Sequence, residues 1–249
     1  MIVTVAFGKG GTAKTSTAAA MVNYARMHGR SVLAIDSDPQ ANFTFALKGN
    51  AAGRGLYDVL TGGMDAADVI QETEQVPLIA AGLNLATAGT AIAGKPGRDF
   101  IMKKALEPLA NSYDLIVIDT QPDLNSLLIN ALTASDTVLL PMQANSFSVM
   151  GLYQMRETIG QVQKYCNPSL TVAGIVLTRY KARQTLAKDM RETVASLAAE
   201  MGTRLFDTFI REGVAVEQAQ SLQQSLFEFA PNSNPAKDYE SLFREMELI

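Results

Sequence analysis

The sequence predicts an α/β fold in which a mostly parallel, twisted sheet is flanked by helices on both faces. Short apolar runs recur without the alternation of a half-exposed strand, and segments with helical spacing lie between them. A glycine-rich loop joins the first run to the first helix. Because 249 residues with 47% hydrophobic and 18% charged residues suit one compact core, we expect a single domain over residues 1–249.

The strands are predicted from runs rich in Val, Ile and Leu. They cover residues 2–7, 32–35, 115–118, 137–140 and 172–177. The helices are predicted from apolar residues at helical spacing. They cover residues 15–27, 125–133, 150–165 and 186–200, with an acidic closing helix at 238–249. Strand and helix therefore alternate, and sheets built this way bind ligands at the carboxyl ends of their strands.

Residues 49–96 break this alternation and are rich in Ala and Gly. We expect a short helix at 56–60 and weak strands at 77–80 and 83–86. The region is interpreted as an excursion within the same domain, because no linker or repeat separates it from the rest.

Composition limits the classes of function. A net charge of −4 and a pI near 5.1 mean that attraction to DNA or anionic lipid requires a local patch. One cysteine, Cys166, excludes a disulfide framework or a four-thiolate metal site within one chain, and we expect it to be a packing residue. His28, the one histidine, is expected near a helix end without a catalytic role. With neither a secretion signal nor a long apolar run, we expect a cytoplasmic protein.

A candidate phosphate-binding loop follows the first strand. It consists of Gly8, Lys9, Gly10, Gly11, Thr12, Ala13, Lys14, Thr15 and Ser16, and helix-forming residues come next. Glycines let backbone N–H groups approach phosphates, and the helix N-terminus adds partial positive charge. Lys14 can reach the β and γ oxygens, and Thr15 supplies a hydroxyl for Mg²⁺. The standard pattern GxxxxGK[ST] has glycine where this chain has Ala13, and a glycine-rich turn with two solvated lysines is the alternative.

The spacing Lys9-Gly10-Gly11-x-x-Lys14-Thr15 resembles the deviant Walker A motif of the ParA/MinD family, which leaves the position before Lys14 free. The resemblance implies a single-domain P-loop NTPase that uses ATP and Mg²⁺ and hydrolyses ATP slowly without a partner. It also implies an ATP-dependent sandwich homodimer in which Lys9 reaches the partner subunit's phosphates.

Two acidic motifs follow later strands. Asp36 and Asp38 begin a segment that resembles the family's A′ motif, DxDPQxN. The resemblance implies that Asp38 orients the attacking water and that Asp36 lies near the hydrated Mg²⁺; ordinary turn and helix-cap residues are the alternative. Asp119 ends the third long strand at the Walker B position, where a carboxylate can hold Mg²⁺ through water. The family continues with Thr-Pro-Pro-Ser, whereas this chain has Gln121 and Asp123 in that switch loop.

The resemblance continues to the C-terminal half. Thr178 and Arg179 stand where the family binds adenine, and Ile210 and Arg211 match the other wall of that site. These four residues are therefore candidates for contact with the base. For Arg179, a surface arginine at a strand end is an equally good interpretation.

Small ParA-type ATPases bind DNA without sequence preference through basic residues. Arg183 matches one of these, whereas Ala215 stands where the family has another arginine. Lys181, Arg183, Lys188 and Arg191 could form a phosphate-binding surface that a dimer doubles. A solvated helix face is the alternative.

Other branches of the family fit less well. The phosphate loop begins at residue 8, so we expect no N-terminal helix-turn-helix domain. The tail at 239–249 carries more acids than bases, unlike the basic membrane helix of MinD-type proteins, so we expect no membrane binding. A single cysteine cannot supply the two that iron-protein relatives use per subunit.

The leading hypothesis is a partition ATPase: MgATP drives dimerisation, the dimer binds nonspecific DNA on the nucleoid, and a ParB-like partner stimulates hydrolysis and release. One alternative is an ATP-gated scaffold that positions a protein cargo without DNA binding. Another is a MinD-like regulator or an ATP-dependent synthetase of related architecture.

Overall fold

The computed structural model describes residues 1–180 and 185–248, and it holds one eight-stranded sheet in this part of the chain. The strand order is β3-β4-β2-β5-β1-β6-β7-β8. The strands are β1 Ile2–Val5, β2 Val32–Ser37, β3 Ile70–Gln71, β4 Leu78–Ile79, β5 Leu115–Thr120, β6 Thr137–Met142, β7 Thr171–Tyr180 and β8 Ile210–Arg211. All neighbouring strands pair in parallel except β3 and β4, which are antiparallel. The predicted fold class is confirmed.

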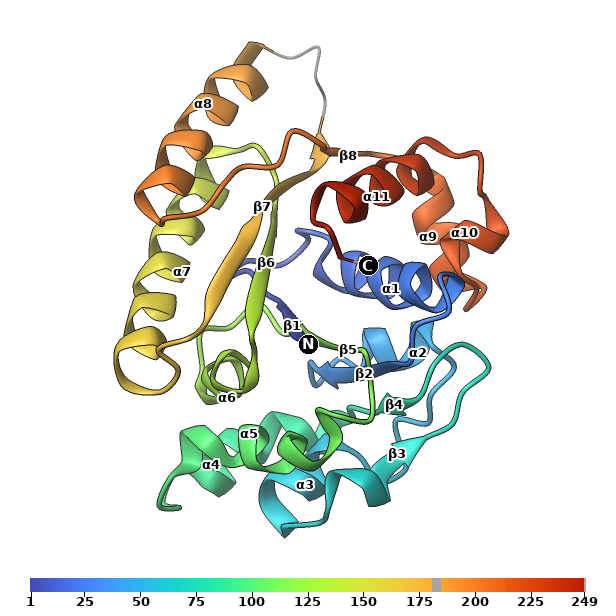
Figure 1. The fold of residues 1–249 in the computed structure, drawn as a ribbon, viewed down its shortest axis with the longest axis vertical. Helices are drawn as coiled ribbons and strands as arrows, with labels where there is room; N and C mark the ends of the chain where they lie inside the picture. The colour runs from blue at the N-terminus through green and yellow to red at the C-terminus, as the bar shows by residue number, and fades with distance from the viewer. Residues whose placement is uncertain (181–184, 249) are drawn as a thin grey trace.

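Helices cover both faces of the sheet (Figure 1). One face carries α1 Lys14–Met27, α9 Val214–Ser221, α10 Leu226–Phe229 and α11 Asn234–Glu245, with α2 Asn42–Ala46 beside them. The other face carries α3 Leu56–Gly62, α4 Ala88–Ile92, α5 Ile101–Leu106, α6 Ser126–Ala134, α7 Ser146–Tyr165 and α8 Thr185–Glu200. Short 3₁₀ helices at Ala66–Val69, Leu83–Thr87, Arg98–Phe100 and Glu107–Leu109 complete the described elements.

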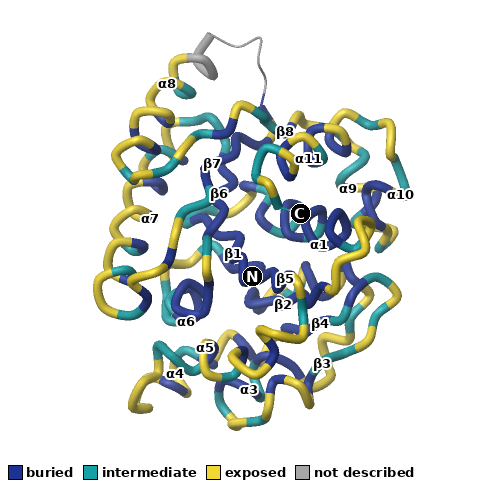
Figure 2. Tube along the Cα trace, viewed as in Figure 1, coloured by how far each residue is buried: buried dark blue, intermediate teal, exposed yellow. Residues whose placement is uncertain are grey.

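The central strands lack polar alternation because both of their faces are buried. On β2, Val32 and Ala34 belong to the core on one side, whereas Leu33 and Ile35 belong to the core on the other. All four are at most 3% exposed. A strand of this kind needs apolar side chains at every position, as the continuous run in the sequence indicated. Figure 2 shows the buried strands inside a shell of helices with exposed outer faces.

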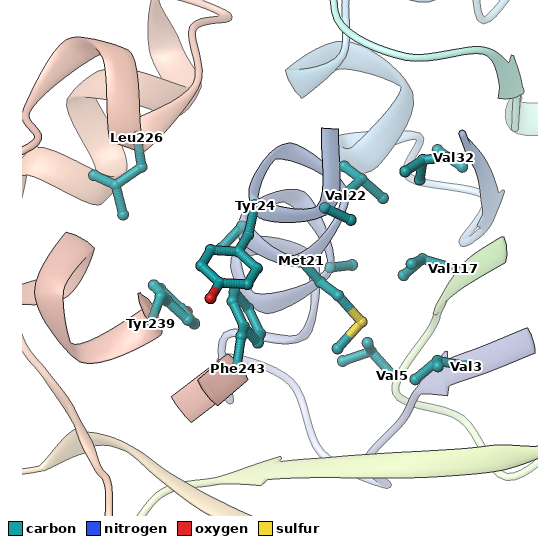
Figure 3. Packing of buried hydrophobic residues seen from close by; sticks show 14 of the residues in the cluster. Val3, Val5, Met21, Val22, Tyr24, Val32, Val117, Leu226, Tyr239 and Phe243 are labelled. Carbon is teal, nitrogen blue, oxygen red and sulfur yellow. The ribbon is translucent and has the colours of Figure 1, made fainter. Parts of the chain in front are cut away.

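Helix α1 holds the phosphate loop because it lies between the sheet and α11. Figure 3 shows Met21 and Val22 facing the strand valines, while Tyr24 lies toward Tyr239 and Phe243 of α11. The Tyr24 and Phe243 ring centroids are 5.2 Å apart. Helix α1 is therefore packed against the sheet on one side and against α11 on the other. At its other end, His28 follows as the C-cap residue, where the sequence placed it.

Several boundaries differ from the prediction. The strand expected at 83–86 is a 3₁₀ helix, in which Leu85 is buried and Leu83 is 82% exposed. Helix α7 begins four residues earlier than expected, because the Asn145 side chain accepts a 2.9 Å hydrogen bond from the backbone N–H of Ser148. The sequence did not predict β3, β8, α2, α4, α5, α9 and α10, which are short and carry little periodic signal.

Candidate functional site

The loop between β1 and α1 has the backbone conformation that a phosphate loop requires. Gly11 and Ala13 adopt left-handed conformations, with φ of 75° and 65°. A side chain at Gly10 or Gly11 would meet no atom within 4 Å, so this part of the loop faces open space. Ala13 holds a conformation that favours glycine, at a cost of roughly 1–2 kcal/mol, which explains why the standard pattern has glycine there.

A cavity of about 550 Å³ lies over this loop. Residues 10–16 line one side, and Asp38, Gln40, Asn42, Phe45 and Pro122 line another. The N-cap residue of α1 has no side-chain cap, so the first N–H groups of the helix remain available to a ligand. An anionic group of phosphate size fits this combination of exposed N–H groups and helix N-terminus.

Lys14 is the cation inside this cavity. Its side chain is buried, and its Nζ donates a 2.9 Å hydrogen bond to the carbonyl oxygen of Lys9. Burial lowers the pKa of Lys14, whereas the negative charges of Asp119, Asp38 and Asp123 raise it. A buried ammonium among carboxylates is placed to bind the oxygens of a phosphate chain.

Thr15 and Asp119 form the candidate Mg²⁺ site. The Thr15 hydroxyl donates a 2.7 Å hydrogen bond to Asp119 Oδ2, and Asp119 Oδ1 is buried without a hydrogen-bond partner. Burial raises the pKa of Asp119 well above its usual range, and the nearby charge of Asp36 adds to this effect. A buried carboxylate oxygen without a partner fits a divalent cation.

This pair does not enclose a metal by itself. Across residues 1–180 and 185–248, no cluster of three or more His, Cys, Asp or Glu side chains is arranged to hold an ion. Mg²⁺ usually keeps several waters and binds through one or two protein groups plus substrate phosphates. Thr15 and Asp119 fit that arrangement, in which the nucleotide supplies the remaining oxygens.

The two aspartates of the A′ segment differ in their surroundings. Asp36 Oδ2 accepts from the N–H and hydroxyl of Thr44, at 2.7 and 2.8 Å, and Oδ1 accepts from the N–H of Asp38 at 3.0 Å. Burial raises the Asp36 pKa to about 6. Asp38 lines the phosphate cavity, and one of its oxygens accepts from the Gln40 N–H at 2.9 Å. Asp38 therefore faces the phosphate cavity, whereas Asp36 anchors the turn. Their catalytic and metal roles stay predictions.

The four residues predicted to contact adenine come together in a second cavity of about 420 Å³. Thr178, Arg179, Ile210 and Arg211 all line it, and it shares Gly11, Ala13 and Ser16 with the phosphate cavity. A nucleotide could therefore extend from one cavity into the other.

Three polar side chains of this second cavity already have hydrogen-bond or ion-pair partners. The Thr178 hydroxyl lies 3.0 Å from the carbonyl oxygen of Thr12 and 3.2 Å from that of Met142. This buried hydroxyl is engaged in holding the phosphate loop, and its predicted contact with the base stays a prediction. Arg179 pairs with Glu212 at 2.8 Å, and Arg211 pairs with Asp238 at 2.6 Å.

Helix α9 supplies cavity residues that the sequence analysis missed. Glu217 and Gln220 line both cavities, and Val214 lines the second one at 70% exposure. No motif marks this helix. In the sequence, α9 is marked only by its place directly after Ile210 and Arg211, which were predicted to contact adenine.

The predicted DNA-binding residues fall near the start of α8. Lys181 and Arg183 lie outside the described residues, and the side chain of Lys188 is likewise not described. Arg191 donates a 3.1 Å hydrogen bond to Asp207 Oδ1, so a carboxylate partly offsets its charge. Ala215 packs against the core beside α1.

Comparison with known proteins gives the family. A model of the AAA domain matches residues 1–172. The sporulation initiation inhibitor protein Soj of Bacillus subtilis is 33% identical, over 98% of this chain and 97% of its own. The chromosome-partitioning ATPase Soj of Treponema pallidum is 32% identical, over 96% and 93%. The chain belongs to the ParA/Soj family. The predicted family is thereby confirmed.

Solved structures of similar ParA-like proteins agree in fold. A putative plasmid partition protein from Borrelia burgdorferi B31, bound to AMPPNP, is 26% identical with a TM-score of 0.82, covering 100% of this chain and 99% of its own. Cobyrinic acid a,c-diamide synthase from Mycobacterium smegmatis, with bound ATP analog and magnesium, is 29% identical with a TM-score of 0.79, covering 94% and 98%. The predicted activity, ATP hydrolysis, and the predicted cofactors, ATP and Mg²⁺, agree with these relatives and structures.

The described helices are also limited in length and hydropathy. None of them, in residues 1–180 or 185–248, is both long and apolar enough to cross a bilayer.

Proposed function

We propose that this chain is a partition ATPase in which MgATP drives formation of a sandwich homodimer that binds DNA without sequence preference. The observation that carries the proposal is the different placement of the two loop lysines. The Lys14 ammonium is buried in the phosphate cavity, whereas Lys9 does not line that cavity and its ammonium lies over the Phe147 ring. Lys14 can bind the phosphates of the ATP in its own subunit, and Lys9 is free to bind those of the ATP in a partner subunit.

The residues around the cavity have different roles in ATP hydrolysis. Asp38 orients a water molecule that attacks the γ-phosphorus, and the bond to the β–γ bridging oxygen breaks to give ADP and phosphate. Thr15 and Asp119 would hold Mg²⁺, which would offset the charge of the phosphate oxygens. Lys14 binds the β and γ oxygens, and Lys9 adds a second positive charge from the partner subunit.

Hydrolysis is proposed to be slow until an activating partner acts. Asp38 lines the phosphate cavity, and the neighbouring switch loop carries Gln121 and Asp123 in place of the family's residues. A ParB-like protein that orders this loop would raise the rate and dissociate the dimer. The protein is then cytoplasmic, and nucleoid-associated when ATP is bound.

A protein-cargo scaffold remains as a second candidate function because of charge. The chain has a net charge of −4, Arg191 is paired with Asp207, and Ala215 replaces one of the arginines expected for DNA binding. In this alternative the ATP switch is the same, but the dimer positions a protein cargo.

Binding of duplex DNA by the purified full chain separates the two functions. Wild type and Arg183→Glu are compared with ATP, ADP or no nucleotide at two salt concentrations, with Glu192→Gln as a control on the exposed surface of α8. ATP-dependent binding that weakens with salt and is lost in Arg183→Glu supports the partition function. An ATP-dependent dimer that ignores DNA in every condition supports the scaffold.

Light scattering tests the dimer itself. Lys9→Ala is expected to bind nucleotide as a monomer but to lose ATP-dependent dimerisation, because its contact lies across the interface. Unchanged dimerisation of Lys9→Ala would refute the trans role of this lysine.

A further inference from the structure

Lys9 uses two different groups to make its contacts. Its carbonyl oxygen accepts hydrogen bonds within the loop, from Lys14 Nζ at 2.9 Å and from the Thr12 hydroxyl at 3.4 Å. Its ammonium nitrogen lies 4.8 Å from the centroid of the Phe147 ring, which is within the range of a cation–π interaction. Among the described residues, no acidic side chain lies within salt-bridge distance of this ammonium.

Phe147 is not part of the hydrophobic core. Its ring is 75% exposed, and it belongs to the first turn of α7. With Lys9, Met150 and Gln154 it lines a groove of about 420 Å³ between the phosphate loop and that helix. An exposed ring contributes little to stability through burial. Its contact with Lys9 is therefore the interaction that needs an explanation.

The structure holds Phe147 and the phosphate loop in a fixed relation. Gln143 Nε2 donates to the carbonyl oxygen of Gly11 at 2.8 Å, and Asn145 Nδ2 donates to Gln143 Oε1 at 3.2 Å. The Asn145 side chain also caps α7. This chain of hydrogen bonds ties the start of α7 to the loop that carries Lys9, so the ring and the ammonium stay within reach of each other.

We propose that Phe147 is a positioning residue that holds the Lys9 ammonium in the monomer and releases it when a second subunit presents its ATP phosphates. This inference rests on the proposed trans role of Lys9. A charge-assisted contact with phosphate is stronger than an exposed cation–π contact. The Lys9 ammonium therefore leaves the Phe147 ring and binds the phosphates when the second subunit binds. Loss of the contact between Lys9 and the Phe147 ring costs a small amount of free energy when the dimer forms. Phe147 thereby raises the protein concentration at which ATP drives dimer formation.

The size of the effect follows from the strength of the contact. An exposed cation–π contact of ~0.5–1 kcal/mol corresponds to an about two- to fivefold change in the dimer dissociation constant for each lysine. A symmetric dimer releases two such contacts. Phe147→Leu, which keeps an apolar side chain but removes the ring, should therefore tighten ATP-dependent dimerisation.

NMR of lysine-labelled full chain tests the contact, with Lys9→Met to assign the signal. In the nucleotide-free protein, the ring current of Phe147 should shift the Lys9 ε-CH₂ protons upfield. The shift should remain in Phe147→Tyr, which keeps the aromatic face, and disappear in Phe147→Leu. Tyr153→Leu, which removes another exposed ring of α7, should leave it unchanged. A Lys9 signal that is the same in wild type and Phe147→Leu overturns the proposal.

Sedimentation with a non-hydrolysable ATP analogue tests the consequence. We expect a lower dimer dissociation constant for Phe147→Leu than for wild type, and equal constants for wild type, Phe147→Tyr and Tyr153→Leu. If wild type dimerises and the dissociation constant of the Phe147→Leu dimer is equal to or higher than that of wild type, the proposal is overturned. Failure of wild type to dimerise would instead overturn the proposed function, and thermal unfolding checks that each variant is folded.

Discussion

Thr15 and Asp119 are 104 residues apart in the sequence and joined by a 2.7 Å hydrogen bond in the structure. This contact brings the hydroxyl at the start of α1 to the end of β5, because β1 and β5 are parallel neighbours with Val5 paired to Asp119. Asp119 is also paired in register with Asp36 of β2. Two buried carboxylates therefore lie at paired positions of neighbouring strands, and the Thr15 hydroxyl contacts one of them.

The stability of the nucleotide-free protein should fall as the pH rises from about 4 to 6. Burial raises the Asp36 pKa to about 6, from a usual value of 3.8, so in this range the folded state keeps a proton that the unfolded state has released. The free energy of unfolding is greatest below this window and decreases by about 2 kcal/mol as the pH rises from 4 to 6. The raised pKa of Asp119 acts in the same direction. Urea unfolding at several pH values measures the slope.

Asp36→Asn is the matched variant for this measurement. It removes the titrating group, so its free energy of unfolding should change less between pH 4 and 6 than that of wild type. Asp65→Asn, at an exposed position, should follow wild type. Equal slopes in wild type and Asp36→Asn would contradict the assignment of the raised pKa.

Lys14→Ala should abolish detectable ATP binding. The buried ammonium is the cation of the phosphate cavity, and its loss removes charge-assisted hydrogen bonds worth about 1.5–3 kcal/mol each. Calorimetric titration with MgATP measures the affinity. Lys9→Ala is the control, since that lysine should not be needed for binding by a monomer; equal affinities of wild type and Lys14→Ala would refute the assignment.

Asp38→Ala should yield an ATP-bound dimer that hydrolyses slowly. Asp38 lines the cavity with a carboxylate that can orient water, and loss of such a group typically lowers the rate about 100-fold or more. Phosphate release measures the rate, and light scattering measures the dimer. Asp65→Ala should hydrolyse like wild type. Normal turnover by Asp38→Ala would show that another group positions the water.

Thr178→Val should weaken both stability and nucleotide binding. The valine keeps the shape of the side chain but removes the hydroxyl that lies against the Thr12 and Met142 carbonyl oxygens, at a cost of about 1–2 kcal/mol. Urea unfolding and MgATP titration give the two effects. Thr158→Val, whose exposed hydroxyl donates to the Gln154 carbonyl oxygen at 3.0 Å, is the matched control. If both valine variants behave alike, Thr178 does not support the loop.

The fold class, the phosphate loop and the acidic residues at the strand ends could be predicted from the sequence alone. Buried parallel strands need continuous apolar runs, and the loop needs glycines, Lys14 and Thr15 at a fixed spacing. Both signals are local, so a single chain displays them. Asp119 could be located for the same reason, because it directly follows the apolar residues of its strand.

Which groups lie together in these sites depends on the packing of the whole chain. Thr178 reaches the phosphate loop from 166 residues away, and Gln143 reaches it from 132. Helix α9 lines both cavities without any motif, and Phe147 meets Lys9 because the start of α7 is tied to the loop. Such contacts depend on how the strands are ordered in the sheet and how each connection packs. These long-range contacts cannot be predicted from periodicity or residue spacing along the chain.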